Sequence, residues 1–76
     1  MFDRITFDPQ IMGGRACIRG MRMTVSMIVN LVANGMTREE ILREYLYLEP
    51  EDIRQALQYA ASLASEEVYS LTMSQS

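Results

Sequence analysis

The spacing of apolar residues divides the chain into a short β-prone segment followed by helical segments. Residues 1–23 are broken by glycines and show no helical period. Within them, residues 16–18 and 21–23 are predicted to form two short strands of a hairpin that turns at Arg19-Gly20. Residues 24–66 have apolar positions three and four apart, which is typical of helices with a buried face.

The first predicted helix begins after Thr24, whose hydroxyl suits the N-cap position. Asn34-Gly35 is expected to end this helix, because glycine readily adopts the left-handed conformation that closes many helices. Its apolar residues follow the helical period at Val25, Ile28, Val29 and Val32. Further apolar residues lie on its other sides, so more than one neighbour is expected to bury it.

A capping box predicts a second, short helix. Thr37 and Glu40 stand three residues apart, so each side chain can bond a free backbone amide at the start of the helix. The residues expected to face inward are Ile41, Leu42, Tyr45 and Leu46.

The third helix is predicted to begin at Pro50, because proline suits the first helical position. Glu51 and Asp52 suit the positive end of the helix dipole. The inward stripe is expected at Ile53, Ala56, Leu57, Ala60 and Leu63 or Ala64. The outward residues are expected at Arg54, Gln55, Gln58, Ser62 and Ser65.

The helical pattern decays from Glu66 onward, so residues 1–66 are predicted as one small domain and residues 67–76 as a C-terminal tail. Apolar residues of the tail are Val68, Tyr69, Leu71 and Met73. Three interpretations stay open: the tail frays, it adds as a strand to the sheet of a protein partner through these four residues, or it packs on the helices of this chain or of a dimer mate.

Three helices with a tight turn before the last one have the outline of a helix-turn-helix. The fold class is therefore predicted as mainly α, a three-helix homeodomain-like unit behind a short N-terminal β-hairpin segment. Carboxylates crowd the start of the third helix, at Glu49, Glu51 and Asp52. Because a polyanion repels them, any contact with DNA is expected from the N-terminal segment instead.

Composition excludes most catalytic chemistry. The chain has no His, no Lys and one Cys, so it cannot build a His-based catalytic triad, a Schiff base, an internal disulfide or a Cys/His zinc site. We predict no enzyme, no catalytic residue, no cofactor and no metal site. No apolar run approaches the ~20 residues of a membrane span, and the N-terminus lacks the layout of a signal peptide, so a cytoplasmic protein without membrane contact is expected.

Charge is unevenly distributed along the chain. Residues 1–22 hold four arginines against two aspartates, whereas residues 23–76 hold three arginines against eight carboxylates. Residues of the basic segment that could hold DNA or another anion are Arg4, Gly13, Gly14, Arg15, Arg19, Gly20 and Arg22. In the alternative interpretation, the glycines form turns and the arginines are solvated or paired with carboxylates of the acidic part.

Several blocks of the sequence resemble domain-of-unknown-function family 433, a prokaryotic family of small proteins. The matching residues are Ile5, Asp8-Pro9, Ile11, Gly13-Gly14-Arg15, Cys17-Ile18-Arg19-Gly20, Arg22, Glu39-Glu40-Ile41-Leu42, Leu48, Glu51-Asp52-Ile53 and Ala56-Leu57. They extend from residue 4 to about residue 62. Two positions depart from the family pattern: Ala16 replaces a usual Pro, and Met21 a usual Thr.

The resemblance implies a homeodomain-like, three-helix fold and an antitoxin of the VapB-like kind, whose partner is a PIN-like ribonuclease toxin and whose further target is operator DNA. A helix that is apolar all round in so small a domain also predicts a homodimer. An alternative function, from another class, is a small anion- or nucleotide-binding domain that uses residues 13–22.

Overall fold

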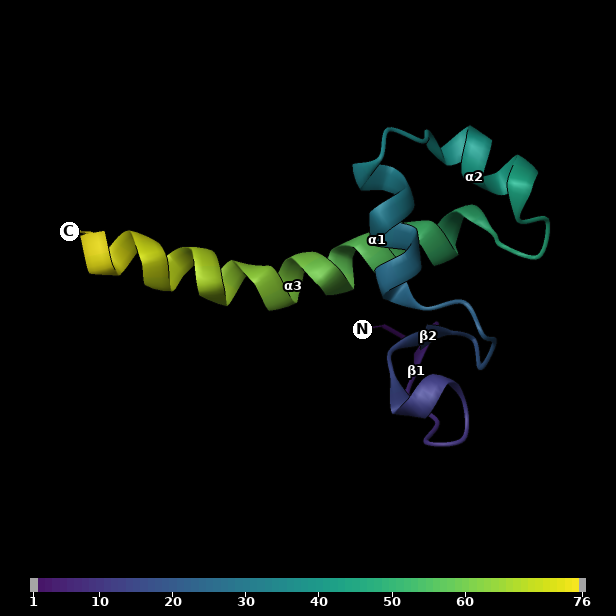
Figure 1. The fold of residues 1–76 in the computed structure, drawn as a ribbon, viewed down its shortest axis with the longest axis horizontal. Helices are drawn as coiled ribbons and strands as arrows, with labels where there is room; N and C mark the ends of the chain where they lie inside the picture. Colours follow the sequence, from purple (N-terminus) through teal and green to yellow (C-terminus); the bar gives the residue numbers. More distant parts are fainter. Residues whose placement is uncertain (1, 76) are drawn as a thin grey trace.

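The computed structural model describes residues 2–75, with side chains up to residue 64. The elements in chain order are β1 (Ile5–Thr6), the 3-10 turn η1 (Met12–Gly14), β2 (Cys17–Ile18), α1 (Val25–Ala33), α2 (Arg38–Glu44) and α3 (Pro50–Gln75). In Figure 1, α1 crosses α3, while α2 lies on one side of this pair and the two strands on the other. The predicted fold class, mainly helical behind an N-terminal hairpin, is confirmed.

The predicted strand over residues 16–18 and the turn at Arg19-Gly20 are confirmed, but the predicted strand over residues 21–23, and its role as the hairpin partner, is wrong. β1 pairs antiparallel with β2, with Ile5 opposite Ile18 and Thr6 opposite Cys17. Residues 21–23 form no strand, because the chain bends there after β2. The amide of Met21 bonds the Ile18 carbonyl at 2.8 Å, and the chain returns to β2 through a single bridge between Cys17 and Thr24.

The predicted starts of α1 and α2 are confirmed. The Thr24 hydroxyl accepts a hydrogen bond from the Met27 amide at 3.0 Å. Thr37 and Glu40 form both halves of the capping box, with bonds of 2.8 and 3.2 Å. Gly35 ends α1 with a φ of +94°, in the left-handed region predicted for it.

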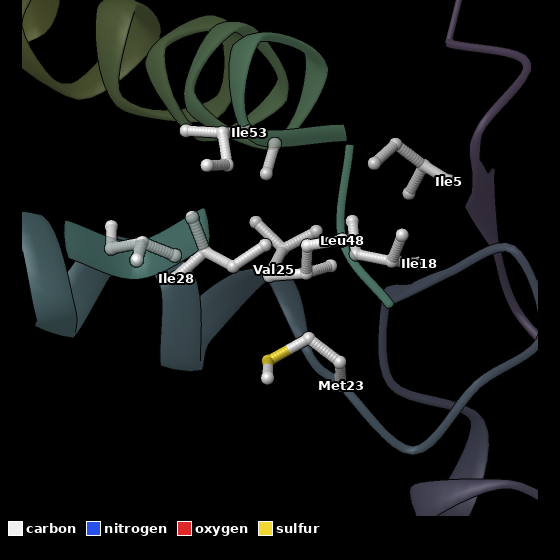
Figure 2. Packing of buried hydrophobic residues seen from close by; sticks show 9 residues of the cluster. Ile5, Ile18, Met23, Val25, Ile28, Leu48 and Ile53 are labelled. Carbon is white, nitrogen blue, oxygen red and sulfur yellow. The ribbon is translucent and has the colours of Figure 1, made fainter. Parts of the chain in front are cut away.

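One hydrophobic core joins the strands to the three helices. Figure 2 shows Ile5 and Ile18 from the strands beside Val25 and Ile28 of α1 and Ile53 of α3. α2 contributes Ile41, which is fully buried. This packing fixes the strands against the helices, so the N-terminal segment is part of the domain.

Two predictions about single side chains near the start of α3 are wrong. Leu46, expected inside, is 85% exposed, because α2 ends at Glu44 and the helical period that would turn Leu46 inward is lost. Gln55, expected outside, is buried. Asp52 lies within the helix start as predicted, but its side chain is fully buried.

α3 continues beyond the predicted end of the domain. Its backbone is helical as far as Gln75, so residues 67–75 do not form an extended strand in this structure. The side chains of Val68, Tyr69, Leu71 and Met73 lie outside the described residues. Figure 1 shows the last part of α3 projecting away from every other element.

Candidate functional site

A buried carboxylate organises the start of α3. Oδ1 of Asp52 accepts hydrogen bonds from Nη1 of Arg4 and Nε of Arg19, each at 3.0 Å. Oδ2 accepts one from Nη2 of Arg19 at 2.9 Å and one from the Glu49 amide at 2.8 Å. We call Arg4, Arg19 and Asp52 the arginine–aspartate cluster. Its carboxylate is fully satisfied, as a buried charge requires.

The β sheet brings the two arginines together. Arg4 directly precedes β1 and Arg19 directly follows β2, so the antiparallel register places them side by side. The Arg19 amide bonds the Arg4 carbonyl at 2.8 Å. Arg19 has a φ of +46°, an uncommon conformation for a residue with a side chain, and the bidentate pair with Asp52 holds it there.

Hydrogen bonds and neighbouring charges shift the pKa values of the residues in the cluster. Burial alone would raise the pKa of Asp52, but the bonds from Arg19, the Glu49 amide and Arg4 outweigh it, so the pKa lies below the ordinary value. The hydrogen bonds that Arg4 donates to the carboxylates of Glu49 and Asp52 raise the pKa of Arg4. The bond to Asp52 likewise raises the pKa of Arg19 despite its desolvation. The cluster is therefore charged near neutral pH and has no group poised for proton transfer.

A second set of bonds fastens the chain before β1 to α3. The amide of Gln55 accepts from the Arg4 backbone at 3.0 Å and donates to Asp3 at 2.7 Å and to Glu51 at 3.0 Å. The bonds from Arg54 and Gln55 lower the pKa of Glu51 to about 2. The start of α3 is thus covered by the chain's own N-terminal segment.

The structure brings together two of the predicted anion-binding residues, Arg4 and Arg19, but on a carboxylate of the same chain. Arg15 and Arg22 are exposed. The glycine amides also have internal acceptors: Gly14 bonds the Ile11 carbonyl and Gly20 bonds the Thr6 hydroxyl. Gly13, with a φ of +67°, shapes the η1 turn. Part of the alternative interpretation, pairing with the acidic segment, is confirmed for Arg4 and Arg19.

Beside the cluster, the turn between α2 and α3 displays two apolar side chains. Leu46 is 85% exposed and Tyr47 is 50% exposed. Nη2 of Arg19 donates to the Tyr47 carbonyl at 2.9 Å, Leu48 is buried in the core, and the rings of Tyr45 and Tyr47 meet edge to face at 6.3 Å. We call residues 46 and 47 the Leu46–Tyr47 turn. Sequence analysis missed it because the helical period was extended past the end of α2.

An apolar groove of about 710 Å³ lies between α1, α3 and the loop before β2. Its larger apolar residues are Phe7, Val25, Val29, Tyr59 and Leu63. Phe7 is 56% and Leu63 59% exposed. Arg15 is the charged residue among those that line the groove, so one predicted anion-binding side chain reaches it.

The described part of the chain contains no group of three or more His, Cys, Asp and Glu side chains placed to hold a metal ion. Cys17 lies in β2 and is buried. No helix within the described residues is sufficiently long and apolar to cross a membrane.

The structure defines the class of protein: a three-helix domain in which an N-terminal hairpin is hydrogen-bonded to the start of α3. The chain belongs to the family described as Protein of unknown function (DUF433), whose model matches residues 5–60. This confirms the resemblance read from the sequence blocks.

A solved structure supports the same assignment. The crystal structure of a DUF433 member protein from Anabaena variabilis is 30% identical in sequence and superposes with a TM-score of 0.74. The match covers 87% of this chain and 64% of that chain, so this chain spans less than two thirds of its relative. Among curated proteins, none matches.

Proposed function

We propose that this chain is a non-enzymatic interaction protein, the antitoxin-like member of a toxin–antitoxin pair, and that it binds a PIN-like ribonuclease through the Leu46–Tyr47 turn. The observation that supports the proposal is the pair of exposed apolar side chains on a turn whose backbone is fixed from both sides. Exposed apolar residues that are adjacent and rigid are typical of protein-binding surfaces.

Rigidity is what makes this turn suitable. Arg19 holds the Tyr47 carbonyl, and the buried Leu48 anchors the next residue, so little conformational freedom remains to be lost when a partner binds. Leucine and tyrosine then offer apolar area, and the tyrosine hydroxyl offers a polar contact at the edge of the interface.

Charge around the turn fits a basic partner. Between residues 36 and 51 the chain has five carboxylates against two arginines; Glu49 and Glu51 pair with arginines outside this range, and Glu39, Glu40 and Glu44 are exposed. A ribonuclease must present positive charge to its polyanionic substrate, so an acidic surface with an apolar centre complements it.

We do not extend the proposal to operator DNA or to an anion site. Arg4 and Arg19 are already paired within the chain, and the start of α3 is covered. Binding of operator DNA stays a prediction from the sequence. Strand addition by residues 67–76 would require the end of α3 to unwind, so it is not part of the proposal either.

Co-expression with the products of the neighbouring genes tests the proposal. We expect one of them to be a PIN-like ribonuclease whose toxicity and RNA cleavage this chain suppresses. The variants Leu46→Gln and Tyr47→Ala should each weaken the binding of the purified ribonuclease at least about tenfold in calorimetry, as loss of an interface anchor does. Leu63→Gln makes the same substitution at an exposed leucine of the apolar groove, so it is the matched control for Leu46→Gln.

Two results would refute the proposed function. One is the absence of any toxic ribonuclease that the chain neutralises. The other is tight binding of such a ribonuclease that is unaffected by both changes in the Leu46–Tyr47 turn, which would place the interface on another surface.

A further inference from the structure

Among the side chains that the structure describes, the contacts of α3 with the core end well before its C-terminus. Tyr59 and Ala60 are the last described residues of α3 that pack against the core, and residues 61–64 are exposed. The helix nevertheless continues to Gln75 and projects beyond all other elements (Figure 1). We call residues 61–75 the projecting half of α3. At 1.5 Å per residue it is about 22 Å long.

A helical segment of this length is marginal in water without tertiary contacts. Serine and threonine are also common in it, and both favour helices weakly. The projecting half therefore needs a surface to pack on if it is to remain helical to Gln75.

The apolar groove lies at the base of this projecting half. α3 itself supplies one wall, with Leu63 and Ala64, and α1 supplies the other, with Val25 and Val29. Small residues line much of the rest, namely Gly14, Ala16, Ser26 and Ala60. Small side chains allow the backbone of an entering helix to come close, and Phe7 and Leu63 remain exposed to cover its apolar face.

The positive charge at the apolar groove indicates that a helix with negative charge fits into it. Arg15 is the charged residue among those lining the groove. In the sequence, Glu66 and Glu67 follow Leu63 by three and four residues, so they come at the next helical turn after it. The projecting half of α3 thus combines apolar residues with the negative charge that would pair with a groove arginine.

We infer that the apolar groove is filled by the projecting half of α3 from a second copy of this chain. The exchange is reciprocal about a twofold axis, so each copy contributes one groove and one helix, and the negative charge that the sequence carries at residues 66–67 of one copy complements the positive charge of Arg15 of the other. The interface involves Leu63 from both copies. It is separate from the Leu46–Tyr47 turn, so the dimer and the proposed partner do not compete for one surface.

The first test is sedimentation equilibrium of the full chain over a concentration series, with far-ultraviolet circular dichroism at each concentration. We expect a dimer that dissociates on dilution, with helicity falling as the projecting half loses its contacts. Leu63→Gln should raise the dissociation constant about a hundredfold, because the substituted residue enters the interface twice. Leu46→Gln, the same change at a more exposed leucine, should leave dissociation unchanged.

The second test reverses charge across the interface. Arg15→Glu should weaken the dimer at least about tenfold, and adding Glu66→Arg and Glu67→Arg should restore it, because the attractive pairing is re-formed with opposite signs. Arg22→Glu changes the net charge equally at an exposed arginine outside the groove, and it should have no effect.

A monomer at all concentrations up to about 100 μM, a value typical of weak association, would overturn the inference. A dimer that is unaffected by Leu63→Gln, or one that the charge reversal does not restore, would also overturn it. Both outcomes are independent of the proposed function, because ribonuclease binding is tested by the variants of Leu46 and Tyr47.

Discussion

The carboxylate of Asp52 accepts bonds from three parts of the chain: the residue before β1, the residue after β2 and the turn before α3. Its partners Arg4 and Arg19 lie 48 and 33 residues away. Helical periodicity places position 52 near the start of α3, but it contains no information on such distant partners. For this reason the burial of Asp52 and Gln55 could not be predicted from the sequence, although the pairing of arginines with the acidic segment could be named as an alternative.

Removing the charge of Asp52 is expected to destabilise the domain. Asp52→Asn keeps the shape of the side chain but leaves Arg19 without its carboxylate and Arg4 with Glu49 alone, and its amide hydrogens face other donors. We expect the free energy of unfolding at neutral pH to fall by about 3 kcal/mol, measured by urea denaturation. Glu51→Gln, which loses the surface pair with Arg54, should change it much less.

The same variant should alter the pH dependence of stability. Because the pKa of Asp52 is lower in the folded chain than in the unfolded one, its contribution is complete above the unfolded value of about 4 and is lost as the pH falls through the folded value. Between pH 7 and pH 2 the wild-type chain should therefore lose more stability than Asp52→Asn. Parallel curves for the two proteins would contradict a charged Asp52.

At the scale of elements, local signals predicted the helices well, and long-range pairing was predicted poorly. Thr24, Gly35 and the Thr37–Glu40 box determine helix ends through contacts within a few residues, so the sequence displays them directly. β2 instead finds its main partner in β1, more than ten residues earlier. A hairpin between neighbouring segments is the simpler expectation from the sequence, and in the structure only a single bridge, between Cys17 and Thr24, forms on that side of β2.

The capping box offers a test at this scale. α2 has seven residues, too few to be stable without its cap and its contact with the core. Thr37→Ala removes the hydroxyl that accepts the Glu40 amide, and we expect a loss of about 1 kcal/mol in thermal or urea unfolding. Thr37→Ser retains the hydroxyl and should remain close to wild type. Equal losses in the two variants would show that the methyl group, rather than the cap, stabilises α2.

At the scale of the whole molecule, the opposite charges of the basic and acidic segments are partly paired with each other inside the domain. The basic segment contributes Arg4 and Arg19 to the acidic start of α3 and leaves Arg15 and Arg22 exposed. Exposed carboxylates flank the Leu46–Tyr47 turn along the sequence, while the apolar groove lies between α1, α3 and the loop before β2. The domain therefore has two exposed surfaces of different chemistry, one for each of the two contacts that we propose.

This division predicts how salt affects the proposed partner complex. An acidic surface speeds the encounter with a basic ribonuclease, and screening shortens the reach of that attraction to about 10 Å at 0.1 M salt. We expect the association rate, measured by stopped-flow fluorescence, to fall as salt rises. Glu39→Gln with Glu44→Gln should lower the rate at low salt and flatten its salt dependence, while dissociation stays nearly unchanged. Gln10→Lys shifts the net charge in the same direction in the loop after β1 and should have little effect. Equal effects of the two changes would mean that net charge, rather than the surface around the Leu46–Tyr47 turn, guides the partner.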